Sequence, residues 1–418
     1  MQKILLLIAS LFYFNFILAE NEIKSWQGIH ETPLSRLEQQ FADPPVEFAN
    51  HVIWGWEGKM DKKTICNDLD SIKKKGFRAV IFEAGYKLPF KYLSEEWFKA
   101  IRTGVLEAKK RGMKVWIIDE GKYPSGFAGG KFSQERPDLR MQALVIGDTI
   151  QIKRGEVMTN HKIAPEIISA VAVSTSGDPN RTVAINNGEI SFNAGLDDWK
   201  ILLVKSDFRT AVTRAVNNPN GGKDATNSLC DYLNPVAVQQ FIDWTHEQYK
   251  KYLGKELGTT VLGFRGDEPD YAHLPWTPSI VQTFKDTKGY DPTPYLASFF
   301  TTSPTIQEQR VKADYWDVWS SLFATHFFKL QADWCAANGV AHITHLNKEH
   351  EMPACVKAEG DYFRNLSKVQ IPGVDAIWNQ IWPGTLNDFP KLASSVAHVY
   401  GKPRAFSESF AAYHISPT

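Results

Sequence analysis

The chain has 418 residues, which is long for one ordinary domain but within the range of α/β barrels that carry insertions. Its 47 Lys and Arg residues balance 47 Asp and Glu residues, so no net charge draws it to nucleic acid or to an anionic membrane surface. Hydrophobic residues make up 43% of the chain, enough for a large core. The 13 tryptophans include candidates for stacking on sugar rings, although most are expected in the core.

The N-terminus has the pattern of a secretory signal peptide. A positive charge at Lys3 precedes an apolar run over residues 4–18, and cleavage is expected near Ala19. The alternative is an uncleaved membrane anchor, for which the run is rather short. We therefore predict a secreted or periplasmic protein that has no membrane contact after cleavage.

Strands and helices then alternate, which predicts a parallel sheet. Ser94 is a good N-cap for the second of these helices, and a basic run before Gly76 is a good end for the first. The elements expected in this part are strands over 51–56, 77–82 and 113–118, and helices over 60–75 and 94–111.

The region 143–206 has a different character, since short β-rich runs replace the helical period. An Asn-Gly turn signal at residues 187–188 separates two of these runs. We predict a small antiparallel β subdomain inserted after the third strand. Its expected strands cover 146–153, 168–173, 182–185, 189–192 and 199–205.

The alternation resumes at Asn234, an N-cap followed by proline at the first helical position. Expected helices cover 236–253, 305–338 and 386–400, and expected strands cover 259–264, 340–346, 374–378 and 404–407. An aromatic stripe in the long helix is assigned to the core and consists of Trp316, Trp319, Phe323 and Phe327.

These elements predict a TIM-like (β/α)8-type barrel that is incomplete, because seven strands are found and no eighth follows. The two alternatives are a fragment of a longer protein, which we favour, and an open barrel with an exposed edge. The expected organisation is a signal peptide over 1–19, barrel segments over 20–142 and 207–418, and the inserted subdomain over 143–206.

The four cysteines show no CxxC spacing, so a structural zinc site is not expected from their pattern. Cys66 and Cys335 fall within helical patterns and are interpreted as buried small apolar residues. Export would permit a disulfide, but the sequence does not pair the cysteines.

The predicted strands end in acidic and aromatic residues. Asp267 and Glu268 follow the strand over 259–264 and stand directly before Pro269, which cannot continue a sheet. In an α/β barrel this end of the strands carries the catalytic groups, although an acidic surface turn is the plain alternative. The residues at or after the other strand ends are Trp54, Trp56, Glu83, Asp119, Glu120, His345, Glu349 and Glu408.

Several carboxylates, aromatic residues and no redox motif favour glycoside hydrolysis. This chemistry needs one protonated carboxylic acid for the leaving oxygen and one ionised carboxylate as base or nucleophile. Crowding in a cleft separates the pKa values of such groups. No G-x-S-x-G elbow and no H-E-x-x-H motif occurs in the chain.

The chain from Trp54 to Tyr413 resembles glycoside hydrolase family 106, the α-L-rhamnosidases. The motifs that carry this resemblance are each short, and their order is the specific feature. They are residues 112–115 with 119–120 and 123–126 (YPSG), 231–235 (DYLNP), 266–269 (GDEP), 334–335 with 338–339, 345–347 with Glu349, 372–375 (PGVD), 394–401 and 407–410 (SESF).

The resemblance implies an inverting, exo-acting enzyme that removes terminal α-L-rhamnose from plant pectic or related glycans, with calcium helping to hold the sugar. It implies Glu268 as general acid and Glu349 as general base, with Glu351 and Glu359 competing for the second role. Glu408 is expected to orient the sugar or bind calcium. The remaining expected sugar contacts are Trp54, Trp56, Glu120, Tyr123, Asp267, His345 and Asp375.

Two alternatives stay open. One is a catalytically inactive carbohydrate-binding remnant, which needs no perturbed carboxylate pair. The other is a metal-dependent hydrolase of another class, which would need two histidines and a carboxylate to converge. The glycosidase hypothesis predicts that Glu268 and Glu349 face each other at about 6.5–9.5 Å, the separation of inverting enzymes.

Overall fold

The structure is a computed structural model that describes residues 33–44, 50–121, 123–210, 228–271, 274–377, 380–381, 384 and 387–409. The predicted signal peptide lies outside these residues, as do Trp378 at the end of a predicted strand and Tyr413. No helix within the described ranges is long and apolar enough to cross a membrane.

Seven parallel strands form the main sheet, and their order in the sheet follows their order in the chain. All seven were predicted, with boundaries shifted by a few residues. The strands are β1 (His51–Trp56), β2 (Ala79–Ala84), β3 (Lys114–Ile118), β10 (Val261–Asp267), β12 (Ala341–His345), β13 (Ile371–Ala376) and β14 (Phe406–Ser409).

Both faces of the five inner strands are buried, as expected for parallel strands with nearly continuous apolar runs, whereas β1 and β14 at the edges are partly exposed. One cluster consists of strand residues alone, among them Ile81, Trp116 and Ile343, which meet across the inside of the curled sheet. A second cluster joins the opposite face to the helices, for example Phe264 to Trp97 and Leu253. The sheet is therefore a barrel-like layer whose described strands end at β1 and β14 without pairing with each other.

The helices pack outside the sheet; the N-caps at Ser94 and Asn234 were predicted, and a third N-cap at Asp61 was not. Asp61, Ser94 and Asn234 each accept a backbone N–H at the start of a helix. The α-helices are α2 (Leu34–Ala42), α3 (Lys62–Lys74), α4 (Glu95–Lys110), α5 (Lys131–Glu135), α6 (Pro235–Trp244), α7 (His246–Leu253), α8 (Ile280–Lys288), α9 (Ile306–Leu322), α10 (Lys329–Ala337), α11 (Met352–Glu359), α12 (Tyr362–Leu366) and α13 (Lys391–Val399).

Two predicted helices depart from a regular α-helix. The helix expected over 236–253 breaks at Thr245 into α6 and α7. The one expected over 305–338 is continuous but contains a π-helical turn at Phe323–Phe328, which separates α9 from α10. The aromatic stripe is core as predicted, since Trp319 and Phe323 are fully buried and Trp316 packs against the same cluster.

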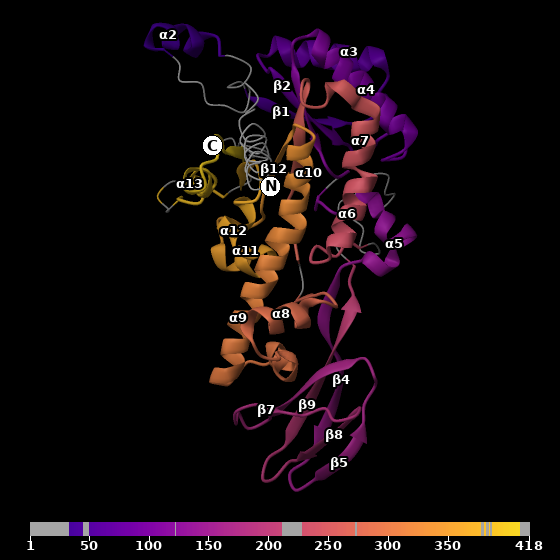
Figure 1. The fold of residues 1–418 in the computed structure, drawn as a ribbon, viewed down its shortest axis with the longest axis vertical. Helices are drawn as coiled ribbons and strands as arrows, with labels where there is room; N and C mark the ends of the chain where they lie inside the picture. Colours follow the sequence, from indigo (N-terminus) through magenta and orange to yellow (C-terminus); the bar gives the residue numbers. More distant parts are fainter. Residues whose placement is uncertain are drawn as a thin grey trace, which may run out of the picture.

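The inserted region forms most of an antiparallel sheet at one end of the molecule, and residues 275–276, which follow the insertion in the chain, add a short edge strand (Figure 1). Its strand order is β11-β4-β9-β6-β7, and β5 pairs separately with β8. The strands are β4 (Gln142–Ile152), β5 (Val157–Lys162), β6 (Ile167–Ser174), β7 (Arg181–Thr182), β8 (Glu189–Asn193), β9 (Trp199–Phe208) and β11 (Pro275–Trp276). The insertion has its own apolar cluster around Trp199 and also packs against the 3₁₀ segment Thr293–Phe300, to which Ser169 is hydrogen-bonded.

Candidate active site

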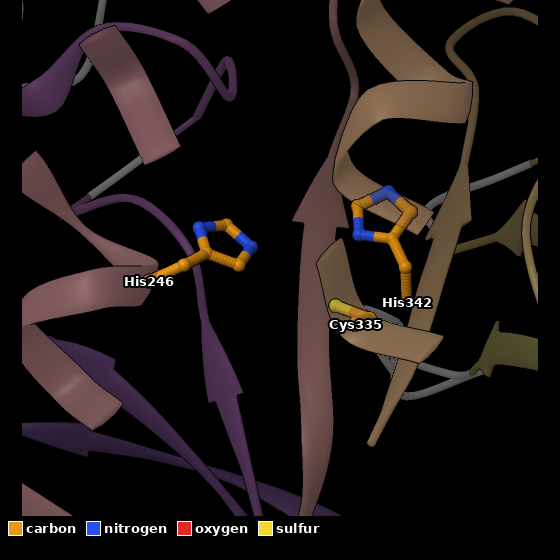
Figure 2. A group of neighbouring side chains, drawn as sticks. All are labelled: His246, Cys335 and His342. Atoms are coloured by element: carbon orange, nitrogen blue, oxygen red, sulfur yellow. The ribbon is translucent and has the colours of Figure 1, made fainter. Parts of the chain in front are cut away.

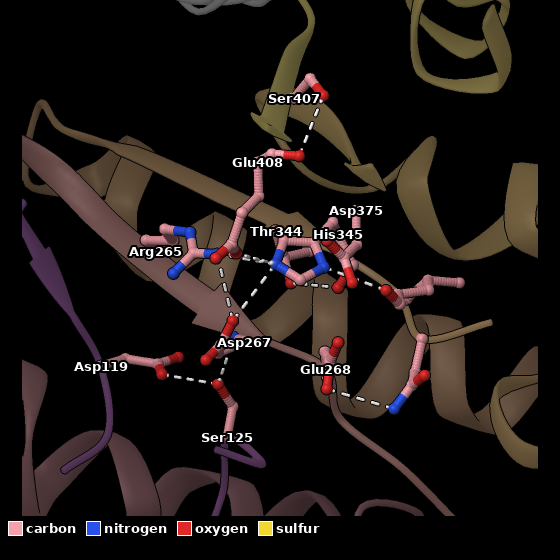
Figure 3. Close-up of polar contacts among 12 residues, drawn as sticks. Asp119, Ser125, Arg265, Asp267, Glu268, Thr344, His345, Asp375, Ser407 and Glu408 are labelled. Atoms are coloured by element: carbon pink, nitrogen blue, oxygen red, sulfur yellow. Dashed lines mark hydrogen bonds and ion pairs between the residues drawn. The ribbon is translucent and has the colours of Figure 1, made fainter. Parts of the chain in front are cut away.

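Four titratable side chains lie together at the carboxyl ends of four neighbouring strands (Figure 3). Asp267 ends β10 and is paired in register with His345 at the end of β12. Asp375 in β13 is paired with Glu408 in β14 in the same way. The parallel register of the strands thus brings together residues that are up to 141 positions apart, from 267 to 408.

Arg265 lies beneath this row and is only 2% exposed. Its Nη2 atom is 3.1 Å from Asp267 Oδ1 and also contacts Glu408 Oε2. His345 Nε2 lies 3.2 Å from the same oxygen of Asp267 and 3.1 Å from Glu408 Oε2. These four residues form an ionic cluster of two cations and two carboxylates.

The ionic cluster determines which of its members carry charge. Burial acts to lower the pKa of His345, but hydrogen bonds to Asp267 and Glu408 outweigh it and raise that pKa well above its usual value. Burial acts to raise the pKa of Glu408, but Arg265 and His345 hold it below its usual value. These two shifts favour an imidazolium at His345 and a carboxylate at Glu408.

Glu268 is a half-buried carboxyl group directly after β10, and its backbone has a positive φ of 41°. Burial raises its pKa well above the usual value, and the nearby acidic groups Asp267, Asp375 and Glu349 raise it further. Its Oε2 atom accepts a hydrogen bond of 3.1 Å from Asn347 Nδ2. Since Asn347 occupies Oε2, Oε1 is the oxygen best placed to carry the proton.

Glu349 is a second carboxyl group, held by backbone amides. Its Oε1 atom accepts hydrogen bonds from Leu346 N at 3.0 Å and from Asp375 N at 3.2 Å. Its Oε2 atom has no hydrogen-bond partner among the described residues. Burial raises its pKa to about 7, while the charge of His345 opposes the shift.

Asp375 links these two carboxyl groups. Its carboxyl group is in hydrogen-bonding contact with that of Glu268, and its backbone N–H binds Glu349. Burial raises the pKa of Asp375 as well. Two carboxyl groups in contact share a proton, because both cannot be ionised at once without strong repulsion.

The two rivals of Glu349 lie in different surroundings. Glu351 is exposed at the start of α11 and is 3.9 Å from His350. Glu359 is fully buried, and both of its oxygens accept the backbone N–H of Asn347 at 2.8 Å. Glu359 thus positions the residue that binds Glu268, and Glu351 faces away into solvent.

The glycine-rich loop after β3 is fastened to the site by Asp119 and Glu120. Ser125 Oγ donates to Asp119 Oδ1 at 2.7 Å and accepts from the backbone N–H of Asp267 at 2.7 Å. Glu120 accepts backbone N–H groups of the loop, from Gly121 at 2.7 Å, from Gly129 at 3.0 Å and from Ala128. Burial raises the pKa of Glu120 to about 7.

The comparison with known families agrees with this geometry. A family model described as alpha-L-rhamnosidase, glycoside hydrolase family 106, matches residues 166–417. The chain belongs to this family. A solved rhamnosidase from Novosphingobium sp. PP1Y superposes with a TM-score of 0.64 at 16% identity, over 89% of this chain and 53% of that one.

This chain is also similar to a curated protein of Formosa agariphila that is described as a putative beta-glucuronidase. It is 24% identical over 432 residues, which cover 90% of this chain and 35% of that protein. The chain therefore spans about a third of this relative and about half of the solved rhamnosidase. The structural likeness supports a barrel-like glycosidase fold.

The structure brings together most of the predicted site residues but not the tryptophans. Trp56 is 0% exposed and Trp54 is 8% exposed, and both pack against Phe82 in the core behind the sheet. Tyr123 is half-buried in the glycine-rich loop. A sugar-stacking role for Trp54 and Trp56 stays a prediction, and the burial of both rings gives it no support.

The predicted calcium contact of Glu408 does not fit the residues around it. Calcium prefers a shell of oxygen ligands. Glu408 instead faces the guanidinium group of Arg265 and the ring of His345, which already neutralise its charge. We therefore assign no catalytic role to a cation at Glu408.

Three residues of the site had been given no role from the sequence: Arg265, Ser125 and Asn347. Arg265 offered a signal, because a charged residue inside an apolar strand must find partners when it is buried. Ser125 and Asn347 are polar residues in loops, and only the folded chain shows that they bind Asp119, Asp267 and Glu268.

Proposed function

We propose that this chain hydrolyses terminal α-L-rhamnosides with inversion at the anomeric carbon. The observation that carries the proposal is the contrast between the acidic groups at the strand ends. Glu268 is half-buried with a raised pKa, and it lies beside the ionic cluster, in which the pKa of Glu408 is lowered. This division between a protonated acid and ionised carboxylates is what glycoside hydrolysis requires.

Glu268 acts as general acid in the proposed reaction. It donates its proton to the glycosidic oxygen as the bond from that oxygen to the anomeric carbon breaks, so that the leaving group departs as a neutral alcohol. Asn347 fixes the carboxyl group through Oε2, and contact with Asp375 keeps a proton shared between the two groups. After each turnover Glu268 takes a new proton from solvent, and the adjacent carboxylate of Asp375 favours its return.

Glu349 acts as general base in the proposed reaction. It takes a proton from a water molecule as the water oxygen bonds to the anomeric carbon on the face opposite the leaving group. Oε1 accepts two backbone N–H groups, whereas Oε2 has no hydrogen-bond partner among the described residues. We therefore assign Oε2 as the oxygen that takes the proton from the water. The amides also favour the ionised form of Glu349 against the effect of burial.

The ionic cluster borders the proposed sugar site and offers fixed acceptors to hydroxyl groups. Asp267 is 14% exposed at its side chain and Glu408 is 17% exposed, whereas Arg265 and His345 are covered. A terminal rhamnose of a plant pectic or related glycan, met outside the cell, is the proposed substrate. Its support is the family membership and the signal-peptide pattern.

The first test compares leaving groups. The wild-type chain is expected to release the alcohol from both p-nitrophenyl and methyl α-L-rhamnoside. Glu268→Gln should lose about 10²–10⁴-fold in kcat/KM on the methyl glycoside and much less on the aryl glycoside, whose leaving group needs little protonation. Equal losses on both substrates would contradict the role of Glu268 as acid.

The same assay separates the activity from its alternatives. p-Nitrophenyl β-D-glucuronide serves as the second substrate, because a relative is described as a putative beta-glucuronidase. Turnover of the glucuronide alone would reject the rhamnoside proposal. A folded wild-type chain that binds rhamnose without turnover would favour the carbohydrate-binding remnant.

A further inference from the structure

A second group of side chains converges away from the strand ends, in the layer between the sheet and the helices. His246 begins α7, Cys335 lies in α10 and His342 lies in β12 (Figure 2). One ligand atom from each side chain lies within 4.8 Å of the other two. The exposed fractions are 0% for His246, 0% for Cys335 and 1% for His342.

The ring nitrogens of this triad are not satisfied by the surrounding protein. His246 Nε2 and both ring nitrogens of His342 have no hydrogen-bond partner among the residues that the structure describes. A buried polar atom without a partner costs free energy, so three of them in one place indicate that another species binds there. The surroundings are apolar, since the His246 ring packs 4.2 Å from Phe264 and 5.2 Å from Trp334 between centroids.

The tautomer of His246 follows from its hydrogen bonds. Thr245 has a single hydroxyl proton, which it donates to Phe241 O at 2.7 Å. In the contact of 2.9 Å between Thr245 Oγ1 and His246 Nδ1, the ring N–H must therefore be the donor. The proton of neutral His246 therefore sits on Nδ1, and Nε2 has a free lone pair. Second-shell hydrogen bonds fix the tautomer of metal-binding histidines in the same way.

Burial keeps both rings in the form that binds metals. It lowers the pKa of His342 to about 3 and that of His246 well below its usual value. Both imidazoles are thus neutral at physiological pH. Burial also raises the pKa of the Cys335 thiol, so the triad without a metal is uncharged.

We propose that His246, Cys335 and His342 bind one thiophilic cation, Cu(I) or Zn(II). Two imidazoles and a thiolate are ligands that both ions accept. Binding forms bonds to the two nitrogens and the sulfur, breaks the S–H bond of Cys335 and releases that proton to solvent. With Cu(I) the occupied site is neutral, whereas Zn(II) leaves one positive charge in the core, which favours Cu(I).

The bound ion would link α7 and α10 to β12, the strand whose last residue, His345, belongs to the ionic cluster at the strand ends. None of its three ligands belongs to the strand-end site. The proposal therefore does not depend on rhamnoside hydrolysis, and metal binding can be measured without any substrate.

The test is metal loading of the purified chain under reducing conditions. Cu(I), Zn(II) or Co(II) is added either to the folded protein or during refolding, because the site is buried, and the bound metal is counted after desalting. We expect about one equivalent per chain, a thiolate-to-metal charge-transfer band with Co(II), and a higher Tm with the bound ion. Competition between Cu(I) and Zn(II) distinguishes the two ions.

Two variants and one control locate the ion. Cys335→Ser and His342→Gln should each lower the affinity at least about tenfold. Cys355→Ser replaces another fully buried thiol and should leave the affinity unchanged. Binding that survives in both ligand variants would overturn the proposal.

The wild-type chain alone also decides the question, should the variants fail to fold. Less than about a tenth of an equivalent under every loading condition would show that the triad binds water or nothing. Bound Co(II) without a thiolate band would show that Cys335 is not a ligand. Either result overturns the proposal.

Discussion

Glu268 and Glu408 lie at the ends of two strands of one sheet, yet their pKa values move in opposite directions. Glu268 has carboxyl groups as neighbours, and they add to the effect of burial. Glu408 has Arg265 and His345 as neighbours, and they overcome it. Neighbouring charge rather than residue type thus assigns the protonated and the ionised roles.

The first prediction at the residue scale concerns pH. In the proposed mechanism, hydrolysis needs Glu349 ionised and Glu268 protonated. Since burial raises the pKa of Glu349 to about 7, activity should fall as the pH drops through about 7. Since the pKa of Glu268 is also raised, activity should persist until the pH rises through the pKa of Glu268. The measurement is kcat/KM on methyl α-L-rhamnoside against pH, and full activity at pH 4.5 would contradict the assignment of Glu349.

A second prediction at this scale concerns Arg265. Arg265→Met removes a guanidinium that is 2% exposed and leaves Asp267 and Glu408 with His345 alone. The free energy of unfolding should fall by about 3–5 kcal/mol, measured by urea denaturation. Arg310→Met is the matched control. The Arg310 side chain is 71% exposed and makes a weak ion pair of 3.9 Å with Asp314, so its loss should lower the free energy of unfolding by less than about 1 kcal/mol.

At the scale of elements, the sheet depends on close approach between strands. A Cβ atom at Gly263 in β10 would overlap the carbonyl oxygen of Ala341 in β12 and lie 2.7 Å from the Trp116 ring. Gly263→Ala should therefore lower the free energy of unfolding by about 1–3 kcal/mol or more. Gly55→Ala in β1 is the control, because its Cβ would meet only Glu83 Oε2 at 3.5 Å. Equal stability of the two variants would contradict the register of β10 and β12.

The strands of the main sheet were predictable from the sequence, whereas the shorter helices α2, α5, α8, α11 and α12 were not predicted. All seven strands of the main sheet and the N-caps at Ser94 and Asn234 follow from local patterns. β5 was missed because almost all of its residues are exposed and it shows no apolar alternation. The break at Thr245 and the π-helical turn were missed because tertiary packing, not propensity, determines both.

At the scale of the whole molecule, the strand ends could be predicted as the site but their pairing could not. The positions of Asp267, Glu268, His345 and Glu408 follow from the strand assignments, whereas Asp375 was expected at the start of its strand and lies near the end of β13. That Asp375 contacts Glu268, and that Arg265 binds both Asp267 and Glu408, depends on the curl and register of the sheet. The same holds for His246, Cys335 and His342, whose sequence spacing carries no metal motif.

The measurement that tests the central claim most directly is the stereochemistry of hydrolysis. Methyl α-L-rhamnoside is incubated with the purified chain, and the anomer formed first is identified by proton NMR before mutarotation. A Glu268 acid and a Glu349 base on opposite faces of the sugar predict β-L-rhamnose as the first product. α-L-Rhamnose as the first product would contradict the account, because it would require a carboxylate nucleophile in place of a base.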